Sequence, residues 1–367
     1  MKKIIIIIAL LFVCLPISFV WAQEPSEVEM APQEEILEGK VTAILDEKTT
    51  IQAGEKTLYQ KLRVGVTKGS LTGKEVEIEV GDIPVVGQPK YQVDDEVVIS
   101  YSKDFEGNDV FYITDFVRRL PLFWLFLIFI VLALVVGQWR GGMSLLGLVI
   151  SFLIIFLFIL PQIYYGKDPI IITIIGSLVI IPISFFLSHG FNRKTIVAMA
   201  GTLIALIIVG ILSQLFIGLA KLTGYASEEA AFLHLAKHGT INMKGILLAG
   251  IIIGALGVLD DITVSQAAIV QQLKEANPKL KWRQLFLRAM NVGQDHIASM
   301  INTLVLVYTG AALPLMLLFI DNPHPFSEIV NYQMIAEEIV RTLVGSIGII
   351  LAVPITTLLA SRMVFNK

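Results

Sequence analysis

Residues 121–138 read PLFWLFLIFIVLALVVGQ, an apolar run that contains no charged side chain. An α-helix rises ~1.5 Å per residue, so this run can cross most of the ~30 Å hydrocarbon core of a bilayer. The composition of the whole chain agrees, because 55% of its 367 residues are hydrophobic and only 16% are charged. Soluble domains hold about 25% charged residues. The sequence therefore predicts a membrane protein.

More apolar segments of spanning length follow this run toward the C-terminus, and each is long enough to form a membrane-spanning helix. We expect an α-helical polytopic membrane domain over residues 118–367. Its seven expected spans lie near residues 121–138, 143–163, 169–188, 195–218, 245–264, 297–320 and 342–361.

The N-terminus has the layout of a secretory signal. Lys2 and Lys3 precede an apolar run, and Ala22 offers a small residue at a cleavage site. We expect residues 1–22 to be either a cleaved signal peptide or an uncleaved N-terminal anchor. Cys14 is the only cysteine in the sequence, so a disulfide framework and a cysteine-based metal cluster are both excluded.

Residues 23–117 form an acidic, soluble segment with 9 Lys/Arg against 20 Asp/Glu, whereas the whole chain has a net charge of −3. Residues 23–36 lack periodicity and contain two prolines, which favours a flexible linker. Residues 37–117 hold five short alternating runs, such as KEVEIEV at 74–80. They predict a small exported β-barrel-like domain of the OB or SH3 type. Its negative charge would repel nucleic acid, so we expect contact with a protein partner or shielding of the membrane part.

The signal and the spans together predict an orientation. The signal sends the β domain outside, and seven spans then leave the C-terminus in the cytoplasm. Loops expected inside hold ten Lys/Arg, and the segments expected outside after the β domain hold seven. This difference agrees with the positive-inside rule, although Arg118 and Arg119 oppose it locally. The expected location is the plasma membrane.

Two loops between the expected spans are longer than a turn. Before the fifth span, His234 and His238 stand four residues apart on an expected short helix, a spacing that can serve a metal. The glutamate of a zinc protease motif is absent from HLAKH, so an interfacial amphipathic helix is favoured over a metal site. After the fifth span, two amphipathic helices are expected on either side of Asn277–Pro278, with Trp282 at the anionic inner membrane surface.

Charged residues and glycines mark the start of the seventh expected span. Glu337 and Glu338 stand three or four residues before Arg341, which favours a helical ion pair that anchors the helix at the interface. Gly345 and Gly348 lie on one side of the helix and indicate a packed face.

The fifth and sixth expected spans carry the most informative polar residues. Asp260 and Asp261 fall at the inner end of the fifth span, and Asp295 falls at the inner start of the sixth. Asn291, Asp295, Ser299 and Asn302 follow one another at helical spacing and form one polar stripe. Lipid cannot satisfy a stripe that runs into the span, so it must face protein or water. The candidate substrate- or ion-binding residues are Asp260, Asp261, Ser265, Gln266, Asp295, Ser299 and Asn302.

Carboxylate, hydroxyl and amide oxygens suit H⁺, Na⁺ or a divalent ion. Such a set is the chemistry of a coupling site in a secondary transporter. A helix cap is the alternative interpretation. Asp260 or Asp261 would then cap a helix that starts at Ile262, and Asp295 would cap the sixth span.

Three stretches of the membrane part resemble the YibE/F-like family. They are GALGVLDDITVSQAAIV at 254–270, NVGQDHIASMINTLVLVYTGAALPL at 291–315 and EEIVRTLVGSIGIILAVPITTLLA at 337–360. The resemblance covers the membrane part, most specifically residues 245–361. It implies a bacterial multi-pass membrane protein with an exported N-terminal segment, and it implies no activity.

Enzyme motifs are missing from the sequence. It contains no Walker loop, GxSxG, HExxH or CxxC, so we expect neither an enzyme nor a cofactor. An intramembrane aspartyl protease needs aspartates on two helices, but the glycine pattern that should surround them is absent.

We therefore expect a transporter or permease-like protein for an ion or small solute, with a polar site between the fifth and sixth spans. The alternative is a non-transporting membrane scaffold or sensor that recruits an envelope partner through the acidic exported domain. The lipid bilayer is the expected environment, and homo- or hetero-oligomers are compatible with the sequence. Nucleic acid is excluded as a partner because no basic patch with aromatic residues is present.

Overall fold

A computed structural model describes residues 34–52, 55–81, 89–104, 106–317, 320 and 325–363. The expected signal or anchor segment and most of the expected linker lie outside these residues. The chain splits into two compact units, one containing the described residues up to Leu132 and the other starting at Ala133. Each unit is described by itself.

The first unit contains an antiparallel β-sheet of five strands in the order β3-β2-β1-β4-β5. The strands are β1 Glu35–Gln52, β2 Glu55–Lys68, β3 Glu75–Val80, β4 Glu96–Lys103 and β5 Asp109–Phe116. The sheet curls until its two edge strands, β3 and β5, contact each other, which makes a half-barrel. In β3 the glutamates are exposed while Ile78 is buried, as the alternation predicts.

The described core of the half-barrel is mostly apolar, and one buried amide lies in it. Leu37, Leu62 and Ile99 are fully buried in it. The Gln60 side chain is also buried, and its Nε2 donates to the Tyr91 carbonyl oxygen at 3.0 Å while its Oε1 accepts from the Tyr91 N–H at 2.9 Å. Both amide groups are therefore satisfied, because the pair copies the two hydrogen bonds of a strand ladder.

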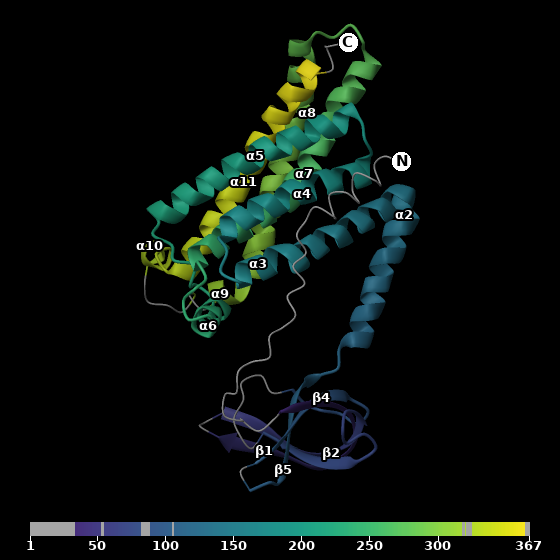
Figure 1. Cartoon of the computed structure of the whole chain (residues 1–367), viewed down its shortest axis with the longest axis vertical. Helices are drawn as coiled ribbons and strands as arrows, with labels where there is room; N and C mark the ends of the chain where they lie inside the picture. The colour runs from purple at the N-terminus through teal and green to yellow at the C-terminus, as the bar shows by residue number, and fades with distance from the viewer. Residues whose placement is uncertain are drawn as a thin grey trace. The chain divides into compact units, whose positions relative to one another are not determined.

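The second unit is helical, and α2 leads into it from the first (Figure 1). The helices are α2 Arg119–Ile154, the π-helix η1 Ile155–Ile159, α3 Leu160–Tyr164, α4 Pro169–His189, α5 Arg193–Leu219, α6 Glu228–Ala236, α7 Met243–Ala276, α8 Trp282–Ala311, α9 Leu313–Leu317, α10 Phe326–Ile329 and α11 Gln333–Met363. α2 is interrupted at Gln138, whose φ of 49° is not helical.

Five helical stretches in the described part of the chain are long and apolar enough to cross a membrane. Four of them, α4, α5, α7 and α11, coincide with expected spans. The first two expected spans form a single stretch, Arg119–Tyr164, which bends at Gln138. The expected span 297–320 falls on the second half of α8 and on α9, which do not meet the same criterion. The count of seven spans therefore stays a prediction.

Side-chain caps fix where three of the long helices begin. The Asp168 carboxylate accepts from the N–H groups of Ile170 and Ile171 at the start of α4. Asn192 and Asn242 accept in the same way at the starts of α5 and α7. These side chains satisfy backbone donors that have no partner within the helix, so the apolar helices begin at defined residues.

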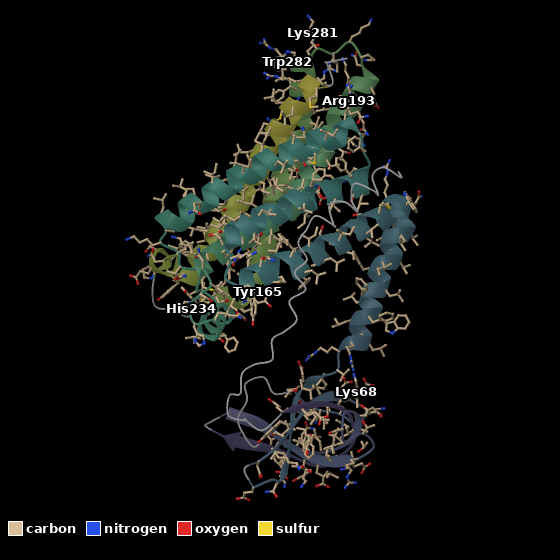
Figure 2. All side chains as sticks on the ribbon, in the orientation of Figure 1. Lys68, Tyr165, Arg193, His234, Lys281 and Trp282 are labelled. Atoms are coloured by element: carbon tan, nitrogen blue, oxygen red, sulfur yellow. The ribbon has the colours of Figure 1, made fainter. Side chains whose placement is uncertain are left out.

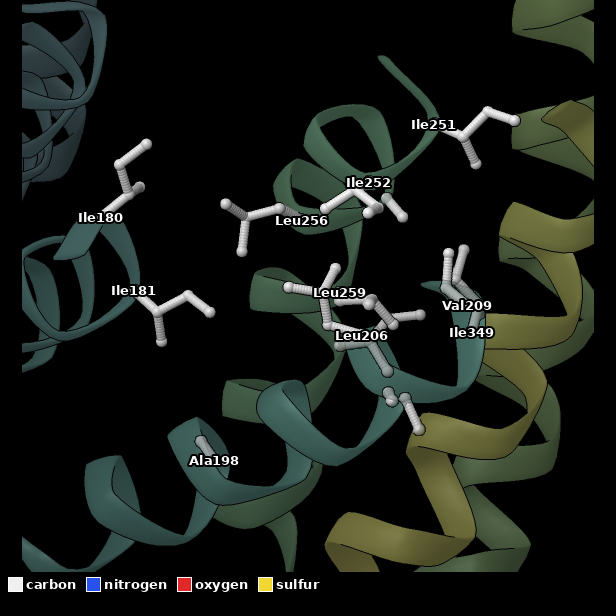
Figure 3. Packing of buried hydrophobic residues seen from close by; sticks show 14 of the residues in the cluster. Ile180, Ile181, Ala198, Leu206, Val209, Ile251, Ile252, Leu256, Leu259 and Ile349 are labelled. Carbon is white, nitrogen blue, oxygen red and sulfur yellow. The ribbon is translucent and has the colours of Figure 1, made fainter. Parts of the chain in front are cut away.

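The core of the helical unit is formed by α5, α7 and α11, which all pack on one another, while α4 packs on α7 and α8 packs on α11 and α7. Figure 3 shows this core, where Leu259 of α7 lies close to Leu206 of α5. α5 and α11 approach closely at two glycines. A Cβ on Gly201 would lie 2.1 Å from Thr356 Oγ1, and one on Gly348 would lie 2.3 Å from Val209 Cγ2. Small residues let the two backbones meet there.

The two ends of the helical unit carry different side chains. Figure 2 labels Arg193, Lys281 and Trp282 at one end and His234 with Tyr165 at the other. The guanidinium groups of Arg283 and Arg362 both lie 5.3 Å from the Trp282 ring centre, within the range of a cation–π interaction. A tryptophan held among arginines fits an anionic membrane surface, as the sequence predicts for this segment.

Candidate functional site

Asp260 lies in the interior of α7, which continues without a break from Met243 to Ala276. It therefore does not cap a helix, and neither does Asp261. Asp295 lies inside α8 in the same way. The cap interpretation is wrong for all three aspartates, because each is flanked by helical turns on both sides.

The Asp260 carboxylate points toward α4. Its Oδ2 accepts a hydrogen bond from Ser184 Oγ at 3.1 Å. Its Oδ1 is buried and has no hydrogen-bond partner in the described part of the chain. One carboxylate oxygen is thus enclosed in an apolar helix packing without a donor, which is a costly arrangement for an anion.

Asp261 is exposed, although it is the next residue. Successive residues of a helix differ by about 100° in direction, so the two carboxylates leave α7 on different sides. Ser265 is half-buried. The structure thus separates the two neighbouring aspartates into one half-buried group, whose Oδ1 is sealed from solvent, and one exposed group.

One turn along α7 from Asp260, a pair of hydroxyls joins α7 to α5. Thr263 Oγ1 and Thr202 Oγ1 are 2.7 Å apart, and both residues are fully buried. Thr263 Oγ1 also donates to the Asp260 carbonyl oxygen at 3.2 Å. The polar contact between α7 and α5 therefore lies directly beside the turn of α7 that carries Asp260.

A further turn along, Gln266 joins α7 to two other helices. Its side chain is fully buried, and its Nε2 donates to Thr357 Oγ1 of α11 at 2.7 Å and to the Ala289 carbonyl oxygen of α8 at 3.0 Å. Its Oε1 is buried without a partner among the described residues. Gly293 makes room for the amide, because a Cβ there would lie 2.9 Å from Gln266 Nε2.

The polar stripe on α8 faces away from this packing. Asn291, Asp295, Ser299 and Asn302 are all exposed in the single chain. The buried residues of α8 include Leu285, Ala289 and Gly293, which lie on the opposite side of the helix. No hydrogen bond or ion pair joins the stripe to Asp260 or Asp261 within the described ranges.

The structure therefore places Asp260 and Gln266 in one polar column along α7, half-buried at Asp260 and fully buried at Gln266, and leaves Asp261 and the α8 stripe outside it. Sequence reasoning missed the partners of that column, which are Ser184, Thr202 and Thr357. Each is a hydroxyl inside an apolar span, and that pattern was visible in the sequence. Which hydroxyl faces which helix was not visible.

The histidine pair does not lie on one helix. α6 ends at Ala236, and His238 has a left-handed φ of 48° beyond its end. His234 Nδ1 instead lies 3.0 Å from the Tyr225 hydroxyl. In the part of the chain that the structure describes, no three His, Cys, Asp or Glu side chains come together as a metal site would require.

Comparison with known proteins gives one match. A family model described as YibE/F-like protein matches residues 125–366, which include every described residue of the helical unit that starts at Ala133. No curated protein and no solved structure matches the chain.

Proposed function

Since the chain belongs to the YibE/F-like family of membrane proteins, we propose that it is a permease-like protein. We further propose that it moves a small cation, or a solute coupled to one, through the polar column along α7. The bacterial plasma membrane is the proposed location, with the β domain outside and the C-terminus in the cytoplasm.

One observation carries the proposal, namely the buried and unpartnered Oδ1 of Asp260. A carboxylate oxygen held in apolar helix packing without a donor is costly, because burial removes its water and supplies no hydrogen bond in exchange. Ser184 offers only one donor to the carboxylate. A proton or a small cation on the second oxygen would remove the unpaired charge, and reversible occupancy of that kind is what a coupling site requires.

The neighbouring turns of α7 support this role. Asp260, Thr263 and Gln266 follow one another at three-residue intervals, about 4.5 Å apart along the axis. Asp260 and Thr263 place oxygen atoms against α4 and α5, and Gln266 places its amide against α8 and α11. Polar groups enclosed by several helices at membrane depth typically mark ion or substrate pathways.

Ion flux into proteoliposomes tests the proposal. The full-length protein should accelerate uptake of H⁺ or Na⁺ over protein-free liposomes, and Asp260→Asn should lower the initial rate by about tenfold or more. Ser184→Ala should lower it less, because the carboxylate itself remains. If uptake of both H⁺ and Na⁺ stays at the protein-free level across a range of imposed gradients, the proposal that these cations move through the column fails.

A further inference from the structure

A second polar feature lies at the end of the helical unit that carries α6 and α10, far along α7 from Asp260. A cavity of about 300 Å³ opens between the start of α7, the start of α11 and the loop before α6. This volume is at the lower end of the range for small-molecule sites. Its lining includes three charged side chains, Glu337, Glu338 and Arg341.

The charges in this cavity do not balance. Arg341 Nε lies 3.2 Å from Glu338 Oε1, which is close enough for an ion pair although the two groups are not aligned for a hydrogen bond, so Glu338 is the carboxylate that neutralises the guanidinium. Glu337 has no cation within 4 Å in the described part of the chain. The three groups therefore carry a net charge of −1, and the excess resides on Glu337.

Glu337 is also the most buried of the three, with 6% of its surface exposed. The Gly224 N–H donates to its Oε1 at 3.2 Å, and Gln333 Nε2 donates to the same oxygen at 2.8 Å. Its Oε2 has no hydrogen-bond partner among the residues that the structure describes, and it is not among the side-chain oxygens sealed away from solvent. A buried carboxylate with one free oxygen facing a cavity calls for a cation.

The rest of the lining narrows the class of cation. Met243, Ile246, Leu247 and Leu315 give the cavity apolar walls. Arg341 lies across the bare backbone of α7, since a Cβ on Gly250 would be 3.6 Å from Arg341 Nη1. A bare metal ion would fill little of this space and would gain nothing from apolar walls, whereas an organic ammonium would use both the carboxylate and the walls.

The geometry points to a binding site for a small organic ammonium, with its nitrogen on Glu337 Oε2 and its apolar body against α7 and Leu315. The sequence alone favoured an interfacial anchor for these charges, and the structure assigns only the Glu338–Arg341 pair to that role. The site goes beyond the proposed transport function, because binding here requires no flux and does not involve Asp260.

Calorimetric titration of the full-length protein in lipid nanodiscs with benzylammonium chloride tests this site. Benzoate and benzyl alcohol serve as probes of matched shape with the opposite or no charge, and sodium chloride serves as the inorganic control. Benzylammonium should bind with a Kd on the order of 1 mM or below, as expected for eight heavy atoms. The three other probes should bind at least about tenfold more weakly.

Two variants and a control decide where the probe binds. Glu337→Gln should raise the Kd for benzylammonium by about tenfold or more, since it removes the unpaired charge. Met334→Trp should also weaken binding, because Met334 is 45% exposed and lines the cavity, so a larger side chain there obstructs the cavity. Glu275→Gln, an exposed glutamate near the other end of α7, should leave the Kd unchanged.

Equal binding of benzylammonium and benzyl alcohol would overturn the assignment, as would binding of sodium with the same affinity. Unchanged binding in Glu337→Gln would do the same. If Glu337→Gln does not fold, Met334→Trp decides, and an unchanged Kd in that variant rejects the site.

Discussion

Gln266 illustrates how much a single buried side chain holds together in this fold. Its amide reaches α8 and α11 from α7 through two hydrogen bonds of 3.0 and 2.7 Å. Thr357 extends this hydrogen-bond chain, because its hydroxyl donates to the Val353 carbonyl oxygen at 2.6 Å within α11. The three helices are thereby joined by a polar connection inside an apolar packing, where unsatisfied groups are costly.

Gln266→Met tests this connection. The variant keeps the volume of the side chain but leaves Thr357 and the Ala289 carbonyl without their donor, so it should cost about 1–3 kcal/mol of stability. The measurement is the thermal unfolding midpoint of the full-length protein in detergent. Gln271→Met on the same helix is the control, because Gln271 is exposed and donates a hydrogen bond to the equally exposed Glu275. An equal midpoint for the two variants would contradict the role given to Gln266.

The residue scale is also where sequence reasoning was least able to predict the site. Asp260 and Asp261 are identical in type and adjacent in sequence, yet one is half-buried against α4 and the other is exposed. Helical periodicity gives the angle between them but not which side of the helix is covered. That depends on where α4 packs, and nothing in a single sequence fixes the position of α4.

At the scale of elements, the apolar pattern predicted where most long helices lie but not where they end. The fifth span was expected to end near residue 264 with a separate short amphipathic helix after it, whereas α7 continues as one helix to Ala276. Residues such as Ala267 and Val270 keep one buried face at helical spacing beyond the apolar run. Hydropathy marks the part of a helix that lies in lipid, and the helix itself continues for as long as packing supports it. The expected break at Asn277–Pro278 is confirmed.

The polar stripe on α8 explains why the sixth expected span is not among the five stretches that are apolar enough to cross a membrane. α8 carries its polar stripe on the exposed side, and this lowers its mean hydropathy. Sequence reasoning identified the stripe correctly as one face of a helix. It also expected that face to turn inward, and in the described chain Asn291, Asp295, Ser299 and Asn302 remain exposed.

Two glycines of α11 make a matched test of helix packing. Gly348→Ala should destabilise the protein by about 1–3 kcal/mol, because the added methyl would meet the stiff, fully buried side chain of Val209. Gly345→Ala should be neutral or stabilise by up to about 1 kcal/mol, since nothing lies within 4 Å of its Cβ position. Thermal unfolding of both variants gives the comparison. A larger loss in Gly345→Ala than in Gly348→Ala would refute the packing of α5 on α11.

At the scale of the whole molecule, composition predicted a β unit and a helical unit, and the structure contains both. The strong acidity of one segment and the apolar runs of the other are properties of long stretches. A prediction based on them therefore does not depend on placing any single residue correctly. Contacts between helices join residues that are distant in sequence. Ser184 and Asp260, for example, are separated by 76 positions in the chain. Such contacts depend on the assembled fold and cannot be inferred from local pattern.

The proposed orientation is open to a labelling experiment in intact cells. Cys14 is the only native cysteine, so a Cys14→Ser background gives a clean reference. A membrane-impermeant maleimide should label Lys103→Cys at the end of β4 but should label Lys279→Cys, between α7 and α8, only after lysis. Both positions are exposed. Labelling of Lys279→Cys in intact cells would reverse the orientation.

The central claim, that the enclosed oxygen of Asp260 holds the coupling cation, is tested most directly by comparing two neighbouring substitutions. The measurement is the initial rate of cation uptake into proteoliposomes containing equal amounts of Asp260→Asn or Asp261→Asn protein. Uptake should fall by about tenfold or more with Asp260→Asn and stay within about twofold of wild type with Asp261→Asn. Equal rates in the two variants, or a greater loss with Asp261→Asn, would contradict the claim.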